Sequence, residues 1–138
     1  MALGAVALDT NAYTAFKLGR PEAREIIRSA GSIGLSAVVV GELLAGFAAG
    51  NRVARNRAEF GQFLSSPRVQ IMAVTETTAD YYARVFAALR RKGRPVPTND
   101  LWIAASALEH GQKLYSYDGH FAEIDGLISG QVPEAFQL

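Results

Sequence analysis

Short apolar runs alternate along this chain with longer stretches in which apolar residues recur at helical spacing. This alternation predicts an α/β domain in which a central, mostly parallel sheet is covered by helices on both faces, giving three layers. The predicted strands are residues 3–8, 33–36, 69–74 and 113–117, with a short edge strand at 127–129. The predicted helices include residues 10–17, 21–30, 37–50 and 52–64, and two more occupy the stretch before the fourth strand.

The boundaries of the last two helices have local signals. Thr77 and Asp80 have the spacing of a capping box at the start of the first of them. Prolines remove donors and fix φ, so the segment 93–97 is predicted to be a non-helical connection. Gly111 is predicted to close the second helix. No repeat or linker interrupts the 138 residues, so residues 1–138 are predicted to form a single domain.

The composition excludes several kinds of site. The chain has no cysteine, which excludes disulfides, thiolate zinc sites and a cysteine nucleophile, and agrees with a reducing cytoplasm. No apolar run approaches the roughly 20 residues that a membrane span needs. The first four residues carry no basic group, so a secretory signal is not expected. We therefore expect a cytoplasmic protein with no membrane partner.

The net charge of +1 does not by itself indicate a nucleic-acid-binding protein. The basic residues are nevertheless grouped in two stretches, 52–57 and 90–94. Two interpretations stay open. These stretches are either the basic surface that draws a polyanion toward an acidic pocket, or the solvated faces of two helices.

Four acidic residues stand at the ends or edges of apolar segments. Asp9 follows the first apolar run, Glu42 lies within the helical run 37–50, Asp100 opens a helix, and Asp118 follows the fourth strand. Open α/β sheets bind their ligands in the crevice beyond the carboxyl ends of the strands. Carboxylates crowded there repel one another unless a cation joins them, and such oxygen ligands suit Mg²⁺ or Mn²⁺. The pattern predicts a metal site and phosphate-ester chemistry.

Three of these acids also have a purely structural interpretation. Asp9 can cap the helix that follows it, Asp100 is favoured by the helix dipole, and Asp118 before a glycine can be a turn residue. Glu42 is different because it is flanked by Val and Leu residues, and an ionised carboxylate among core residues needs a partner. A cation would be such a partner.

Four segments occur in a fixed order: LDTN at 8–11, SAVVVGELLAG at 36–46, TNDLWIAASAL at 98–108 and YSYDGHF at 115–121. Together they resemble the PIN-domain nucleases, and most closely the VapC-type toxins of bacterial and archaeal toxin–antitoxin pairs. The resemblance extends over essentially the whole chain and implies a PIN-like fold. Asp9, Glu42, Asp100 and Asp118 match the acidic quartet of that family.

The resemblance also suggests residues that support the quartet. Asn11 matches a polar residue that helps to fix the first acid or a water at the metal. Ser116 stands where the family often has threonine or serine before its last acid. The segment SYDGHF departs mildly from the commoner threonine version, which bears on the supporting role of Ser116 and leaves the metal ligands intact.

The activity implied by the resemblance is metal-dependent hydrolysis of RNA phosphodiester bonds, with Mg²⁺ or Mn²⁺ as cofactor. Asp9 and Asp100 are the expected primary ligands, and Asp118 and Glu42 complete the site directly or through water. This hydrolysis needs a nucleophile, charge stabilisation and help for the leaving alkoxide, and one or two divalent ions supply all three. The implied partners are the RNA substrate, a cognate antitoxin protein and a second copy of the chain in a homodimer.

Two alternatives stay open, a housekeeping RNA-processing nuclease and a catalytically inactive PIN-like module that binds RNA or a partner protein. A phosphate-cradling loop is excluded, because Gly41 and Gly46 are not followed by the required lysine. A phosphoaspartate signalling domain would have an acceptor aspartate at the end of the third strand, where Val74 leads to Thr75. A phosphatase with an aspartyl nucleophile would have an acid at position 11.

The remaining expectations concern histidine and aromatic residues. His110 is predicted to have a structural role. His120 stands two residues after Asp118 and could approach the pocket, but the resemblance suggests instead that His120 and Phe121 pack the turn after the fourth strand. No serine stands beside either histidine, so no nucleophilic triad is supported. The aromatic residues expected to provide apolar surface for a dimer are Trp102, Phe60 and Phe63.

Overall fold

A computed structural model describes residues 3–138 and contains a five-stranded sheet with the order β3-β2-β1-β4-β5. Each neighbouring pair of strands is parallel. The strands are β1 (Leu3–Leu8), β2 (Ala30–Ser36), β3 (Val69–Met72), β4 (Lys113–Tyr115) and β5 (Ser129–Gly130). The predicted α/β architecture with a parallel central sheet is therefore confirmed.

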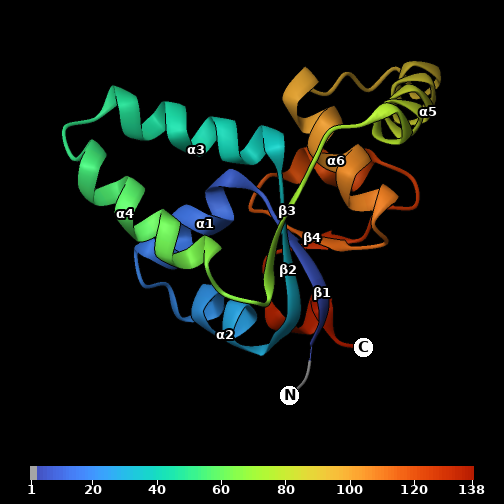
Figure 1. The fold of residues 1–138 in the computed structure, drawn as a ribbon. Helices are drawn as coiled ribbons and strands as arrows, with labels where there is room; N and C mark the ends of the chain where they lie inside the picture. Colours follow the sequence, from blue (N-terminus) through green and yellow to red (C-terminus); the bar gives the residue numbers. More distant parts are fainter. Residues whose placement is uncertain (1–2) are drawn as a thin grey trace.

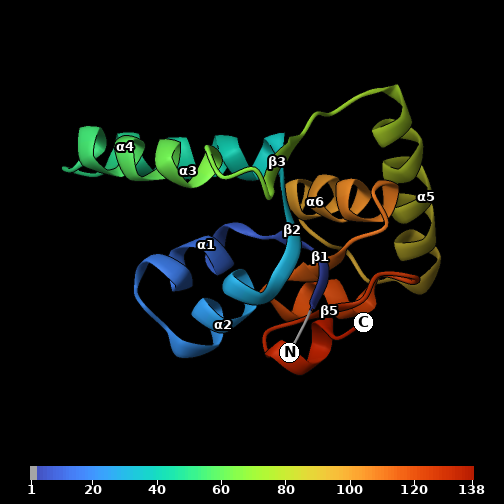
Figure 2. The ribbon, with the colours of Figure 1, turned by 60° about the horizontal axis from the view of Figure 1, so that its bottom comes forward.

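Two helices lie between each pair of consecutive strands from β1 to β4. They are α1 (Thr10–Lys17) and α2 (Pro21–Ser29), then α3 (Ala37–Ala49) and α4 (Val53–Leu64), then α5 (Glu76–Lys92) and α6 (Thr98–Glu109). Two short 3₁₀ helices, Gly119–Glu123 and Pro133–Phe136, flank β5. Helices α1 and α2 cover one face of the sheet and α5 and α6 cover the other (Figure 2), while α3 and α4 extend beyond the strands as a pair (Figure 1).

The strand order places a switch point beside β1. The chain moves from β1 to β2 and β3 on one side, and then returns to β4 on the other side. The connections after β1 and β4 therefore separate from each other and leave a crevice at the carboxyl end of the sheet. Asp9 follows β1 at this point, and its N–H donates to the Tyr115 carbonyl of β4 at 2.9 Å. Asp9 is thus fixed where open sheets bind ligands.

Several boundaries differ from the sequence prediction because strand pairing overrides local pattern. The second strand begins at Ala30 rather than Ile33, since it pairs with β1 from Leu3 onward. The preceding helix therefore ends at Ser29, where Arg68 donates to the carbonyl of Ala30 at 2.6 Å.

The boundaries of three other strands also differ from those predicted. The third strand ends at Met72 instead of Val74, and the fourth ends at Tyr115 instead of Tyr117. The edge strand is Ser129–Gly130 rather than residues 127–129. Each of these strands stops where its pairing with the neighbouring strand stops.

The capping box of α5 also lies elsewhere than predicted. Thr75, not Thr77, is the cap, and its hydroxyl accepts from the N–H of Thr78 while the Thr78 hydroxyl accepts from the N–H of Thr75. Thr78 is fully buried and donates to Oε1 of Glu109 at 2.6 Å, which ties α5 to α6. The predicted non-helical connection at 93–97 is confirmed, and its first residue, Gly93, takes a left-handed φ of 67°.

The aromatic residues expected at the surface are placed differently. Phe60 is buried, with edge contacts to Tyr13 and Phe47 at centroid separations of 5.2 and 6.0 Å, so its prediction as surface was wrong. Phe63 also packs on Tyr13, and Trp102 stacks on Tyr82 at 4.2 Å. Within residues 3–138, no helix has the length and apolar character of a membrane span.

Candidate active site

An open cavity of about 540 Å³ lies at the switch point of the sheet. Three of the four predicted acids line it, although they come from separate parts of the chain: the end of β1, the middle of α3 and the first turn of α6. The lining residues are Asp9, Thr10, Asn11, Thr14, Ala15, Leu18, Arg20, Glu42, Asp100 and Tyr117. We call this cavity the acidic cleft.

Asp9 is the most buried of the four acids, with 6% of its surface exposed. Its Oδ1 accepts from the N–H of Thr10 at 2.8 Å, and its Oδ2 accepts from the Ser116 hydroxyl at 2.7 Å. Burial raises the pKa of Asp9 despite these hydrogen bonds, and the charges of Asp100 and Glu42 raise it further. Asp9 therefore caps α1 and also contributes negative charge to the cleft.

Ser116 connects the first acid to the last. While its hydroxyl donates to Asp9, the same oxygen accepts from the N–H of Asp118 at 2.9 Å. The Asn11 side-chain oxygen accepts from the N–H of Tyr117 at 3.1 Å, so Asn11 contacts the chain leaving β4 rather than Asp9 itself. Both predicted supporting residues thus hold the ends of β1 and β4 together.

Glu42 is partly exposed, although the sequence placed it among core residues. Its Oε1 accepts from the Thr10 hydroxyl at 2.6 Å, and its Oε2 accepts from the Asn99 amide at 3.2 Å. These neutral donors orient the carboxylate between α1 and α6 without neutralising it.

Asp118 lies beside Asp100 in space, and His120 contacts both. The N–H of His120 donates to Oδ1 of Asp118 at 3.0 Å, which caps the first 3₁₀ helix. The imidazole Nδ1 is 2.9 Å from Asp118 Oδ1 and 3.3 Å from Asp100 Oδ2. One ligand atom from each of these three residues lies within 4.8 Å of the other two. The three side chains are therefore close enough to share one cation.

The packing role that the resemblance suggested for His120 was wrong, and the alternative that it approaches the acids is the one observed. Phe121 is fully buried as expected, but the His120 side chain is 52% exposed and faces the two carboxylates. Asp118 caps the turn through the backbone of His120, and this contact brings the imidazole back over the carboxylate. The spacing of two residues between Asp118 and His120 was the only sequence signal for this contact.

The donor set fits a divalent cation. Burial raises the pKa of Asp100, and the charges of Asp118 and Glu42 raise it further, against the opposing effect of His120. The hydrogen bonds of Asp9 use one lone pair on each oxygen, which leaves a second lone pair on each for a metal. Carboxylate oxygens suit Mg²⁺ and Mn²⁺, and an imidazole nitrogen is a further donor for a transition metal.

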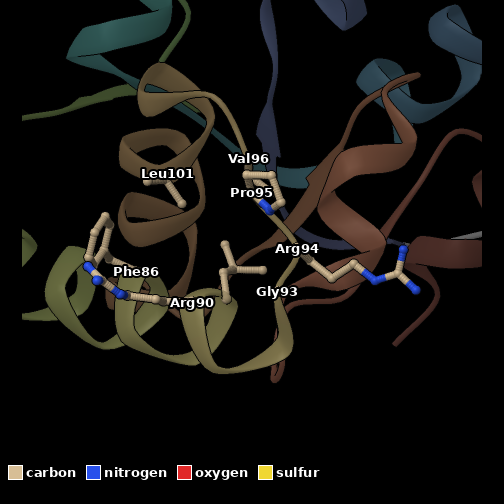
Figure 3. Close-up of a pocket in the computed structure, with 8 residues that line it drawn as sticks. Phe86, Arg90, Gly93, Arg94, Pro95, Val96 and Leu101 are labelled. Atoms are coloured by element: carbon tan, nitrogen blue, oxygen red, sulfur yellow. The ribbon is translucent and has the colours of Figure 1, made fainter.

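A second cavity, of about 370 Å³, lies at the connection between α5 and α6 (Figure 3). Its walls are largely apolar, and the Arg94 side chain points away from them. The described lining residues include no carboxylate; they are Phe86, Leu89, Arg90, Gly93, Arg94, Pro95, Val96 and Leu101. This cavity offers no ligands for a metal, so the candidate active site is the acidic cleft.

Comparison with known proteins agrees with this geometry. Residues 6–127 match the PIN domain. The chain belongs to the PIN-domain family. Its parallel sheet flanked by helices is the fold expected from the resemblance of its sequence to this family.

Similar proteins include VapC ribonucleases and chains of VapBC complexes. The chain is 28% identical over 125 residues to Ribonuclease VapC5 of Mycobacterium tuberculosis, covering 91% of each chain. It is 33% identical over 91 residues to Ribonuclease VapC4 of the same organism, covering 64% of this chain and 68% of the relative. A structure of DNA-bound VapBC from Salmonella typhimurium superposes with a TM-score of 0.80 at 26% identity, covering 94% of this chain and 98% of the other.

The Asp100→Asn variant is expected to be more stable than the wild type in the metal-free state at neutral pH. The raised pKa of Asp100 means that the folded state binds this proton more tightly than the unfolded state does. Ionised Asp100 therefore opposes folding. This destabilisation is absent below pH 3.8, the ordinary pKa of the group, because the carboxyl is then protonated in both states. It grows as the pH rises from there through the raised pKa of the folded state. Urea unfolding in a chelator from about pH 4 to about pH 8 measures the difference.

The control is Asp80→Asn, which removes an exposed carboxylate of α5. This control is expected to change the free energy of unfolding by less than about 0.5 kcal/mol over the whole of this pH range. An Asp100→Asn protein that is less stable than the wild type at neutral pH would show that Asp100 acts as an ordinary first-turn acid, stabilised by the helix dipole. Such a result would contradict the electrostatic account of the cleft.

Proposed function

We propose that this protein is a divalent-metal-dependent endoribonuclease that hydrolyses RNA phosphodiester bonds in the acidic cleft. The observation that carries the proposal is the convergence of Asp9, Glu42, Asp100 and Asp118 at the switch point of the sheet, where no lysine or arginine forms a described ion pair with any of them. Relatives named as ribonucleases support RNA as the substrate.

The proposed cation is Mg²⁺ or Mn²⁺. Asp9 and Asp100 would hold it, with Asp118 and Glu42 completing the site directly or through water. A divalent ion bound there supplies positive charge for the phosphoryl oxygens and the departing alkoxide, and lowers the pKa of a water. His120 contacts two of the acids and would be an additional nitrogen ligand or a balancing charge beside them.

The chain's own contribution is to hold its carboxylates in place before substrate arrives. Asp9 is oriented by the Thr10 N–H and the Ser116 hydroxyl, and Ser116 also contacts the backbone of Asp118. Glu42 is oriented by Thr10 and Asn99. Side chains fixed by such neighbours need little reorganisation when a cation and a phosphate bind, which lowers the free energy of the transition state.

The proposal favours an enzyme over an inactive binding module, because all four acids are present and converge. It also favours a cytoplasmic location, because the cytoplasm contains RNA and is a reducing compartment, which agrees with the absence of cysteine from the chain. The homodimer implied by the resemblance stays a prediction.

Purified protein is expected to cleave RNA with Mg²⁺ or Mn²⁺ and to stop when the metal is chelated. Asp9→Asn and Asp100→Asn should each lower the rate by at least about 10²-fold, because each removes a principal electrostatic element of the site. Gel analysis of a labelled RNA with wild type and variants measures this, with Asp80→Asn as the surface control. Undiminished cleavage in excess chelator, or near-normal rates in both cleft variants, would contradict the proposal.

We also propose that the protein is the toxin of a VapBC-type pair and is inhibited by a cognate antitoxin. Similar chains occur in structures described as VapBC complexes from several bacteria. An antitoxin segment that covers the acidic cleft with an arginine could replace the charge of the metal, since a guanidinium pairs with carboxylates in bidentate geometry.

Expression of the wild-type chain alone is expected to slow bacterial growth, because free nuclease would degrade cellular RNA. The Asp9→Asn variant at a matched protein level should restore growth, as should co-expression of the product of an adjacent small gene. Growth curves with protein levels checked by immunoblot measure both effects. Equal growth of the wild-type and Asp9→Asn strains would count against toxicity.

A further inference from the structure

Arg20 is the only lysine or arginine among the described residues that line the acidic cleft. It stands at the N-cap of α2, in the short turn that joins this helix to α1. Its N–H donates to the Ala15 carbonyl at 3.1 Å, and its own carbonyl accepts from the N–H of Arg24 at 3.0 Å. The backbone of Arg20 is therefore tied to both helices at the edge of the cleft.

The side chain of Arg20 lies over an aromatic ring that is itself held in place. The guanidinium carbon is 5.2 Å from the centre of the Tyr117 ring, a separation at which a cation is attracted to the ring face. The Tyr117 hydroxyl donates to Glu22 at 3.1 Å and lies 2.6 Å from the hydroxyl of Tyr115. Tyr117 also directly precedes Asp118, so the platform under Arg20 is part of the same loop as the fourth acid.

The hydrogen-bonding groups of Arg20 are not used by a carboxylate. Among residues 3–138, none of the salt bridges involves Arg20, and the residue is exposed. The guanidinium lies over the Tyr117 ring, and none of its N–H groups has a described hydrogen bond to a carboxylate. These N–H groups are the donors that match a phosphate. A fixed arginine with open donors beside an acidic cleft is suited to bind an anion there.

The phosphates of a nucleic acid that enters this cleft are repelled by its carboxylates. The cation held by the acids can balance the phosphate that is cut, but the neighbouring phosphates still approach a site lined by Asp9, Glu42 and Asp100. A positive group that lines the same cavity would offset that repulsion and help to position the strand.

We propose that Arg20 binds a phosphate of the RNA next to the phosphate that is cleaved. The inference rests on the proposed nuclease function and names a substrate-binding residue for it. In this role Arg20 helps to bind the RNA strand and to position it in the cleft. The carboxylates, not Arg20, take part in the chemical step.

The test compares Arg20→Ala and Arg20→Lys with Arg28→Ala. Arg28 is an exposed arginine in the last turn of the same helix, outside the residues that line the cleft, so its loss changes the net charge equally. We expect Arg20→Ala to raise KM for RNA about tenfold or more while kcat changes less than about threefold, because a charge-assisted contact to the bound strand is lost. Arg20→Lys should lie between Arg20→Ala and wild type, and Arg28→Ala should resemble wild type.

A second readout does not depend on cleavage. Fluorescence anisotropy of a labelled single-stranded RNA oligonucleotide in Ca²⁺, with intact RNA verified on a gel, gives the affinity at several salt concentrations. Loss of one phosphate contact should reduce the slope of log K against log salt by about 0.7 for Arg20→Ala and leave it unchanged for Arg28→Ala. Thermal melts of all variants show whether the fold is kept, and Arg20→Lys serves if Arg20→Ala does not fold.

The outcomes separate this inference from the proposed function. If wild type binds RNA without cleaving it and the slope still changes at Arg20, the nuclease proposal fails while Arg20 stays an RNA contact. If wild type cleaves RNA and Arg20→Ala matches Arg28→Ala in both KM and slope, the inference is overturned. It is also overturned if Arg20→Ala binds RNA normally and weakens only the complex with a protein partner.

Discussion

The buried hydrogen bond from Ser116 to Asp9 joins the ends of two neighbouring strands, and the geometry of the acidic cleft depends on it. Asp9 follows β1 and Ser116 follows β4, and their side-chain oxygens are 2.7 Å apart with little exposure to water. Because the Ser116 oxygen also accepts from the N–H of Asp118, one hydroxyl positions the first and last acids together. A hydrogen bond in such a low-dielectric place is strengthened, and leaving either partner unpaired would be costly.

The carboxylates in and beside the cleft have structural and electrostatic roles at the same time. Asp9 caps α1, and Asp118 caps the 3₁₀ helix that follows β4. The structural and functional interpretations of these acids are therefore compatible, since a cap needs only one lone pair of a carboxylate. Capping orients each carboxylate, and the raised pKa values of Asp9 and Asp100 reflect the cost of placing charge in this partly buried crevice. A bound cation would offset that cost.

The alternation of apolar runs in the sequence predicted the two acids of the site that follow strands. Asp9 and Asp118 follow apolar runs, and parallel pairing brings such ends to one edge of the sheet, so their proximity was predictable. No periodicity indicates which helical acid faces a distant strand. Glu42 and Asp100 were singled out because they lie within or at the start of helical apolar segments, and the resemblance to the family then grouped them with Asp9 and Asp118. Their predicted function as metal ligands stays a prediction.

Contacts that depend on tertiary packing were not predictable from local pattern. His120 faces two acids because Asp118 caps its backbone, and Arg20 reaches Tyr117 from a turn almost a hundred residues away in sequence. The capping box moved to Thr75 because the buried Thr78 pairs with Glu109 of another helix. Phe60 is buried because Tyr13 of α1 and Phe47 of α3 pack against it, and the sequence of its own helix does not indicate these contacts.

The most direct test of the metal-binding account is anomalous X-ray diffraction from crystals of the full chain grown with Mn²⁺. The account predicts an anomalous peak in the acidic cleft about 2 Å from a carboxylate oxygen of Asp9 and from one of Asp100. The peak should be lost in crystals of Asp100→Asn grown at the same Mn²⁺ concentration. Well-ordered crystals at saturating Mn²⁺ with no peak in the cleft, or with a peak that contacts neither Asp9 nor Asp100, would contradict it.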